Sequence, residues 1–110
     1  MRHAVPFCLL LWGCTAAADQ QLTALKSAHS IVAEWAEVAR LRADGRVTAT
    51  YAGEMADNAR SQLASVRREL QDPADPAARL IDGLGADPDP ARLTAAASGL
   101  GTLEQAHETR

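Results

Sequence analysis

Two apolar stripes with helical spacing, separated by a short glycine-containing turn, constrain the fold of this chain more than any other feature. Within each stripe, apolar residues recur at steps of three and four: Leu25, Ala28, Val32, Trp35 and Ala39, then Ala52, Met55, Ala59, Leu63, Val66 and Leu70. Asp44-Gly45-Arg46-Val47 lies between them, and Gly45 can adopt the left-handed conformation that ends a helix. Two helices of similar length joined by about four residues are expected to fold back on each other. We therefore predict an antiparallel helical hairpin over residues 19–71.

Capping residues indicate where these two helices begin and end. Asp19 precedes the first stripe and Thr48 precedes the second. Side-chain oxygens of both residue types accept hydrogen bonds from the first free backbone amides of a helix, so each is a predicted N-cap. Asp72-Pro73 is expected to stop the second helix, because a residue before proline avoids the helical conformation.

The remainder of the chain, residues 72–110, is punctuated by Asp-Pro dipeptides. An Asp cap followed by Pro at the first helical position is typical of a helix start, so Asp75-Pro76 and Asp89-Pro90 each predict a helix. The first is expected to end near Gly83-Leu84-Gly85. The second is expected to reach about residue 97, where Ser98-Gly99-Leu100-Gly101 should interrupt it before a last turn or two.

Alanine dominates the body of the chain, and few stretches show the alternation of β-branched residues that is typical of strands. The predicted class is therefore all-α: an antiparallel helical hairpin with one or two shorter C-terminal helices packed on it, as a small helical bundle. Trp35 is expected in the core and Tyr51 beside the turn with its hydroxyl in water. A ligand cleft formed by these two aromatic residues is the alternative.

A short apolar segment near the start of the chain follows Arg2 and His3. A positive start, an apolar segment and a small residue at the cut are the pattern of a secretory signal. The segment is far shorter than the roughly 20 residues that a membrane-spanning helix needs. Its end, Leu11-Trp12-Gly13-Cys14, resembles the lipobox of bacterial lipoproteins, and the whole chain resembles small lipoproteins of proteobacteria.

This resemblance implies that residues 1–13 are a signal peptide, removed by cleavage between Gly13 and Cys14. The Cys14 sulfur would carry diacylglycerol and its new amine a fatty acid such as palmitate, and residues 14–18 would form a lipidated tether that frays or extends the first helix backwards. Thr15 stands where Asp is the usual inner-membrane retention signal. The expected location is the cell envelope, at the outer membrane facing the periplasm. An uncleaved N-terminal tail or an ordinary secretory signal are the alternatives.

The charge of the chain argues against two classes of partner. Removal of residues 1–13 takes away Arg2 and leaves 10 basic residues against 14 acidic ones, a net charge of −4. Without a basic patch, neither nucleic acid nor an anionic lipid surface is an expected partner. Cys8 leaves with the leader and Cys14 is alkylated, so no thiol remains for a disulfide, a metal or a nucleophile.

Candidate chemical residues are few. Glu104-Gln105-Ala106-His107 has the Glu-x-x-His spacing of di-iron bundles, but it lacks a second such pair, and we expect a solvated helix end. His29 is expected at the edge of the first stripe. Glu34 and Glu37 are expected to face solvent or Arg40, because two carboxylates on one helix need a pocket to act as an acid and base. No catalytic residue, metal site or cofactor is predicted.

The sequence therefore predicts a lipid-anchored structural or protein-interaction module of the cell envelope, without catalysis. Its expected partners are the membrane, through acylated Cys14, and either a second copy of the chain in a homo-oligomer or another envelope protein. One alternative is the outer-membrane lipoprotein of a phage lysis pair of the spanin type. Another is a small periplasmic protein that binds a metal or a ligand.

Overall fold

The computed structural model describes the backbone of residues 4–109 and the side chains of residues 19–109. The backbone of this part of the chain forms four α-helices and no strand, which confirms the all-α class. The helices are α1 (Ala4–Ala43), α2 (Ala49–Leu70), α3 (Pro76–Asp82) and α4 (Pro90–Glu108).

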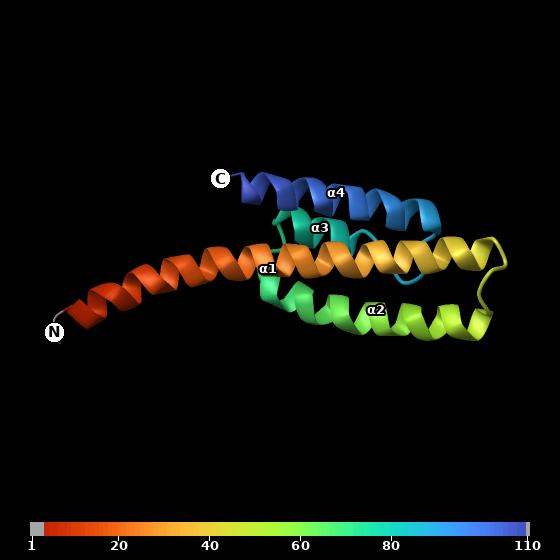
Figure 1. The fold of residues 1–110 in the computed structure, drawn as a ribbon, viewed down its shortest axis with the longest axis horizontal. Coiled ribbons are helices and arrows are strands. Elements are labelled where there is room, and N and C mark those ends of the chain that lie inside the picture. Colours follow the sequence, from red (N-terminus) through yellow and green to blue (C-terminus); the bar gives the residue numbers. More distant parts are fainter. Residues whose placement is uncertain (1–3, 110) are drawn as a thin grey trace.

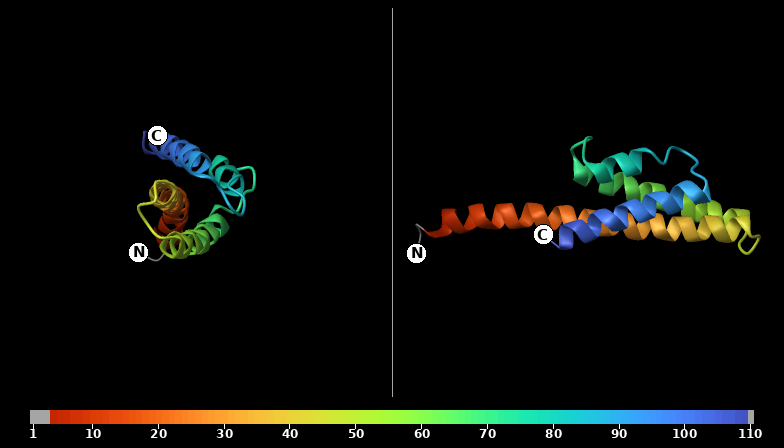
Figure 2. Two further views of the ribbon diagram at one scale, coloured as in Figure 1. Left: turned by 90° about the vertical axis from the view of Figure 1, so that its right-hand side faces the viewer. Right: turned by 90° about the horizontal axis from the view of Figure 1, so that it is seen from above.

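The helices form a ring in which each runs antiparallel to its neighbours (Figure 1). Helix α1 contacts α2 on one side and α4 on the other, and the short α3 contacts both α2 and α4. Seen end-on, the four helices surround a common core (Figure 2). The N-terminal part of α1 projects beyond the other helices, which makes the molecule 63 Å long but only 24 × 22 Å across.

The core is built from the predicted stripes. Leu25 and Val32 of α1 are completely buried, and α4 contributes Leu93 and Leu100, which are equally inaccessible to solvent. Half of the other buried residues are alanines: Ala24, Ala28, Trp35, Val38, Ala59, Leu63, Val66, Leu70, Ala77, Ala78, Leu84 and Ala96. Because so many of them are alanines, the backbones of neighbouring helices can approach one another closely.

Three predicted caps are confirmed. The Thr48 hydroxyl accepts a hydrogen bond from the Tyr51 amide at 3.1 Å and opens α2. Asp75 and Asp89 open α3 and α4 in the same way, with carboxylate-to-amide distances of 2.8 and 2.7 Å. Gly45 ends the turn after α1 with φ +73°, as its position predicts.

The prediction that Asp19 caps the first helix is wrong. The helix begins fifteen residues earlier, at Ala4, and passes through Asp19 and the whole of residues 14–18. Pro6 does not prevent this, because it lies in the first turn, where its missing N–H has no partner inside the helix in any case. The predicted tether therefore extends the first helix backwards.

The predicted interruption at Ser98-Gly99-Leu100-Gly101 is also wrong, because α4 continues through it to Glu108. Both glycines make room for neighbouring side chains. A Cβ on Gly99 would lie 2.9 Å from Cδ1 of Leu80 in α3, and one on Gly101 would lie 3.2 Å from Nε2 of His29 in α1. Close packing on two sides thus offsets the low helix propensity of glycine, which is about 1 kcal/mol per residue.

Candidate functional site

The predicted cleavage and lipidation residues, Gly13 and Cys14, lie on the projecting part of α1. Their side chains lie outside the part that the structure describes. Within residues 19–109, the buried residues begin at Ala24. Cys14 and Ala24 are ten positions apart in this helix, which corresponds to about 15 Å along the helix axis. The buried core thus starts a short, helical distance from the predicted lipid.

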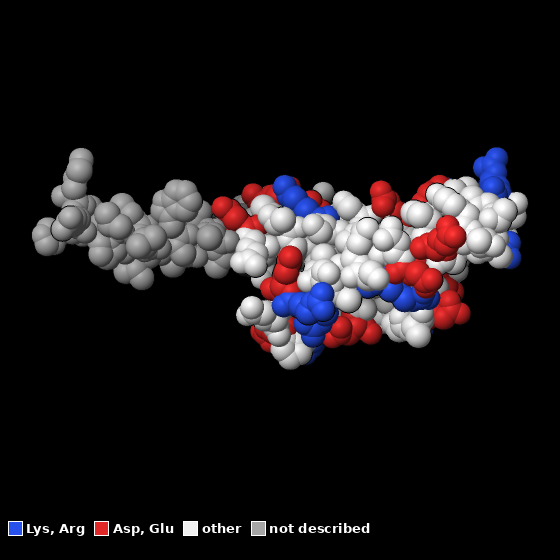
Figure 3. All heavy atoms as spheres, turned by 90° about the horizontal axis from the view of Figure 1, so that it is seen from below, with Lys and Arg blue, Asp and Glu red and all other residues white. Residues whose placement is uncertain are grey.

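The face of the bundle seen in Figure 3 carries charges of both signs. Acidic and basic side chains are interspersed with broad areas of uncharged residues, and no large region has one charge sign. Among residues 19–109, Tyr51 is the large apolar side chain that stands out from the surface, at 46% exposure. Over residues 4–109, no helix combines the length and the apolar character needed to span a bilayer.

A groove of about 440 Å³ opens between α1, α2 and the start of α4. Trp35, which is only 7% exposed, contributes to its lining, so this residue is part of the core as predicted. Tyr51 does not line the groove, so the cleft formed by both aromatic residues is not present there. The rest of the lining is a mixture of apolar residues, prolines, two basic residues and two acidic residues: Arg42, Arg60, Asp57 and Asp87.

Arg60 of α2 fastens the connection between α3 and α4. Its Nε and Nη2 atoms donate hydrogen bonds to the carbonyl oxygen of Ala86, at 3.0 and 2.7 Å. Its Nη1 atom donates to Asp57 at 3.1 Å, and the guanidinium carbon lies 5.3 Å from the centroid of the Trp35 ring. This distance is typical of a cation–π contact. One side chain therefore joins three parts of the bundle.

His29 of α1 lies against α4, where its Nδ1 atom is 2.8 Å from Oε2 of Glu104. The His29 side chain is 39% exposed, which confirms its predicted position at the edge of the apolar stripe. Glu104 thus pairs across helices and not within the Glu-x-x-His sequence that ends at His107. Since the two partners are 75 residues apart, no local pattern could have revealed the pair.

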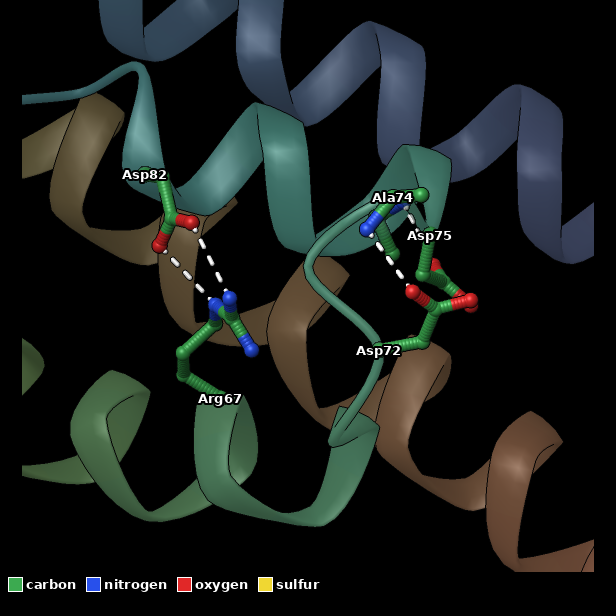
Figure 4. A network of polar contacts seen from close by, with 6 residues as sticks. Arg67, Asp72, Ala74, Asp75 and Asp82 are labelled. Atoms are coloured by element: carbon green, nitrogen blue, oxygen red, sulfur yellow. Dashed lines mark hydrogen bonds and ion pairs between the residues drawn. The ribbon is translucent and has the colours of Figure 1, made fainter.

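An ionic contact crosses between α2 and α3 (Figure 4). Arg67 donates from Nε and Nη2 to the two carboxylate oxygens of Asp82, at 2.9 and 3.1 Å. This hydrogen bonding holds the pKa of the Asp82 carboxyl below its usual value and raises the pKa of the Arg67 guanidinium. At the other end of α3, Gln21 of α1 donates to Oδ2 of Asp75 at 2.6 Å, so both ends of this short helix are tied to a neighbour.

The described part of the molecule holds no cluster of three or more potential metal ligands. Some of its charged side chains pair at the surface: Glu37 accepts two hydrogen bonds of 2.7 Å from Arg40, as the sequence predicts. Within residues 19–109, no polar or charged residue is fully buried. Three of the ionic contacts of the described residues join different helices: Lys26 with Glu108, His29 with Glu104 and Arg67 with Asp82.

Comparisons with known proteins give no relative for this arrangement. The chain matches no protein-family model, and neither the curated proteins nor the solved structures contain a significant match to it.

Proposed function

We propose that this protein is a lipid-anchored structural or protein-interaction module of the cell envelope, without catalysis. It is attached through acylated Cys14 to the outer membrane and faces the periplasm. The observation that carries the proposal is Leu11-Trp12-Gly13-Cys14, the lipobox-like end of a short apolar segment, directly ahead of a polar helical bundle.

The surface of the bundle supports a covalent anchor. The described helices offer mixed charges and one exposed large apolar residue, Tyr51, so they have little to insert into a bilayer. Acyl chains supply that affinity instead, at about 0.8 kcal/mol per buried methylene, and two or more chains give stable attachment. A spacing of about 15 Å along the helix axis separates Cys14 from Ala24, where the buried core begins.

The packing supports a role in binding over one in chemistry. A few ionisable side chains of residues 19–109 pair across the helices, such as His29 with Glu104 and Arg67 with Asp82, and these pairs join neighbouring helices of the bundle. The exposed helix faces are a suitable surface for docking another protein or a second copy.

Metabolic labelling tests the anchor. Bacteria that express the protein are grown with an alkyne-tagged palmitate, and the membrane and soluble fractions are compared for the parent, Cys14→Ser and Cys8→Ser. We expect the parent and Cys8→Ser to carry the label and to sediment with membranes, because Cys8 belongs to the segment that is removed. Cys14→Ser should lose both properties.

The intact mass of the extracted parent protein should correspond to a chain that begins at Cys14 with its acyl groups. A Cys14→Ser protein that is labelled and sediments like the parent would contradict the proposal. Light scattering on the detergent-extracted parent tests self-association: a mass above that of one chain is expected for a homo-oligomer, and a single-chain mass would leave an envelope protein as the partner.

A further inference from the structure

Gly53 of α2 leaves a space that no side chain of the described residues fills. It lies inside the helix at an exposed position, and a Cβ there would meet nothing within 4 Å. The two glycines inside α4, by contrast, make room for Leu80 and His29. Glycine is unfavourable in a helix interior relative to alanine. In α4 close packing offsets this penalty, whereas at Gly53 the space is open to a second molecule.

Gly53 lies on the groove of about 440 Å³ between α1, α2 and the start of α4. Small residues of both long helices line the groove beside it: Ala39 and Ala43 of α1, and Ala52 and Ala56 of α2. The distance between the axes of two packed helices depends on the side chains at the contact and falls to about 8 Å where these are small. The groove can therefore accept the backbone of another molecule at close range.

Two exposed charges of opposite sign lie on the same groove. Asp57 and Arg60 pair with each other at 3.1 Å, but Arg42 and Asp87 form no ion pair with another residue of 19–109. Arg42 is in the last turn of α1, and Asp87 lies just before α4. Because these two helices are antiparallel, α1 ends and α4 begins at the same end of the bundle (Figure 1). The groove thus presents one cation and one anion to a partner.

We propose that this groove is the contact surface of a symmetric dimer, in which Arg42 of each copy pairs with Asp87 of the other. In a two-fold dimer both copies use the same surface, so that residue i meets j and residue j meets i. A surface with one available charge of each sign is complementary to its own copy. The small residues around Gly53 let the two copies approach closely.

The projecting part of α1 is compatible with this dimer. A two-fold axis parallel to α1 leaves the N-terminal ends of both copies pointing in the same direction, as two copies anchored in one membrane require. The choice of a second copy as the partner rests on the homo-oligomer of the proposed function. The groove itself does not depend on acylation of Cys14.

Charge reversal tests the dimer on the detergent-extracted full protein, with light scattering that gives the protein mass separately from the detergent. We expect the parent to have the mass of two chains. Arg42→Asp and Asp87→Arg each place two like-charged pairs in the contact, so each variant alone should raise the dissociation constant by about tenfold or more. In an equal mixture of the two variants every Asp at one position meets an Arg at the other, so the mixture should regain the mass of two chains.

Gly53→Trp tests the groove by filling it. Since a Cβ at this position meets nothing within 4 Å, the bundle should remain helical by circular dichroism while the second copy is excluded, and the mass should fall to that of one chain. Ser61→Trp is the matched control, because Ser61 is an exposed residue of α2 that does not line the groove. It should keep the mass of two chains.

A parent protein with the mass of one chain would overturn the proposal and leave another envelope protein as the partner. A charge-reversed mixture that stays at one chain, or a folded Gly53→Trp protein that dimerises like the parent, would overturn it as well. If Gly53→Trp does not fold, the mixture of the two charge variants makes the same decision. These masses do not report on acylation, so a failure of the anchor appears separately, in the labelling of Cys14.

Discussion

The guanidinium of Arg60 lies over the ring of Trp35, at 5.3 Å, while it donates two hydrogen bonds to the carbonyl of Ala86. Grooves of about 440 and 240 Å³ open on two sides of this contact, and both residues line both of them. Arg60 thus separates the two grooves and covers the most central aromatic side chain of the bundle.

Replacement of Arg60 should loosen this region. We expect Arg60→Ala to lower the free energy of unfolding by about 1 kcal/mol, since it removes a cation–π contact and hydrogen bonds to an exposed carbonyl. Arg60→Lys should lose less, because the charge stays over Trp35. Urea unfolding measures the change. Arg68→Ala is the control, because Arg68 is exposed and its hydrogen bond goes only to the nearby Ser65; an equal loss there would contradict the role of Arg60.

Gly53 of α2 and Gly99 of α4 should respond differently to replacement by alanine. Gly53 lies inside α2, and a Cβ there meets nothing within 4 Å, so Gly53→Ala should raise the free energy of unfolding by about 0.5–1 kcal/mol. Gly99→Ala must displace Leu80 from a contact of 2.9 Å and should be less stable than Gly53→Ala by about 1 kcal/mol or more. Thermal unfolding of both variants measures the difference. Equal increases in stability would contradict the prediction, because they would show that Leu80 of α3 can move away at no cost.

Two identical dipeptides allow a direct test of capping. Asp89 precedes Pro90 and accepts a 2.7 Å hydrogen bond from the Arg92 amide, whereas Asp87 precedes Pro88 in the connection. Asp89→Ala should lower the stability by about 1 kcal/mol, because it leaves the first amides of α4 without an acceptor. Asp87→Ala should change it by only a few tenths. Similar denaturation midpoints for the two variants would contradict the cap.

Acid should weaken the link between α2 and α3. Since the hydrogen bond from Arg67 lowers the pKa of Asp82 in the folded protein, the unfolded chain binds protons more readily. The stability that the pair adds is therefore complete above the ordinary Asp pKa of about 3.9 and is lost as the pH falls through the lower folded value. Asp82→Asn should reduce the melting temperature at neutral pH and flatten its decline in acid. Glu54→Gln, at an exposed position of α2, should keep the steep decline of the parent.

Local patterns were sufficient for the hairpin and its caps, because these depend on neighbours in the sequence. Thr48, Asp75 and Asp89 each accept a hydrogen bond from a backbone amide two or three residues ahead. Such short-range contacts can be predicted from the sequence. The apolar spacing predicted the buried faces of α1 and α2 for the same reason.

The errors arose where tertiary contacts override a local preference. Gly99 and Gly101 favour a break, but Leu80 and His29 from other helices occupy the space beside them and keep α4 continuous. Asp19 is a good cap, but the alanine-rich stretch before it also forms helix, so the cap is not used. The pairing of His29 with Glu104 joins residues whose proximity only the folded ring creates.

The unbroken course of α1 from Ala4 to Ala43 has a mechanical consequence. Successive residues of a helix are rotated by about 100° about its axis. The direction in which a group on the projecting part of α1 points is therefore fixed relative to the faces of the bundle. Two alanines inserted next to Asp19 would turn the bundle by about 200° about the helix axis and present its opposite side, whereas seven would return it to nearly the same orientation, farther out.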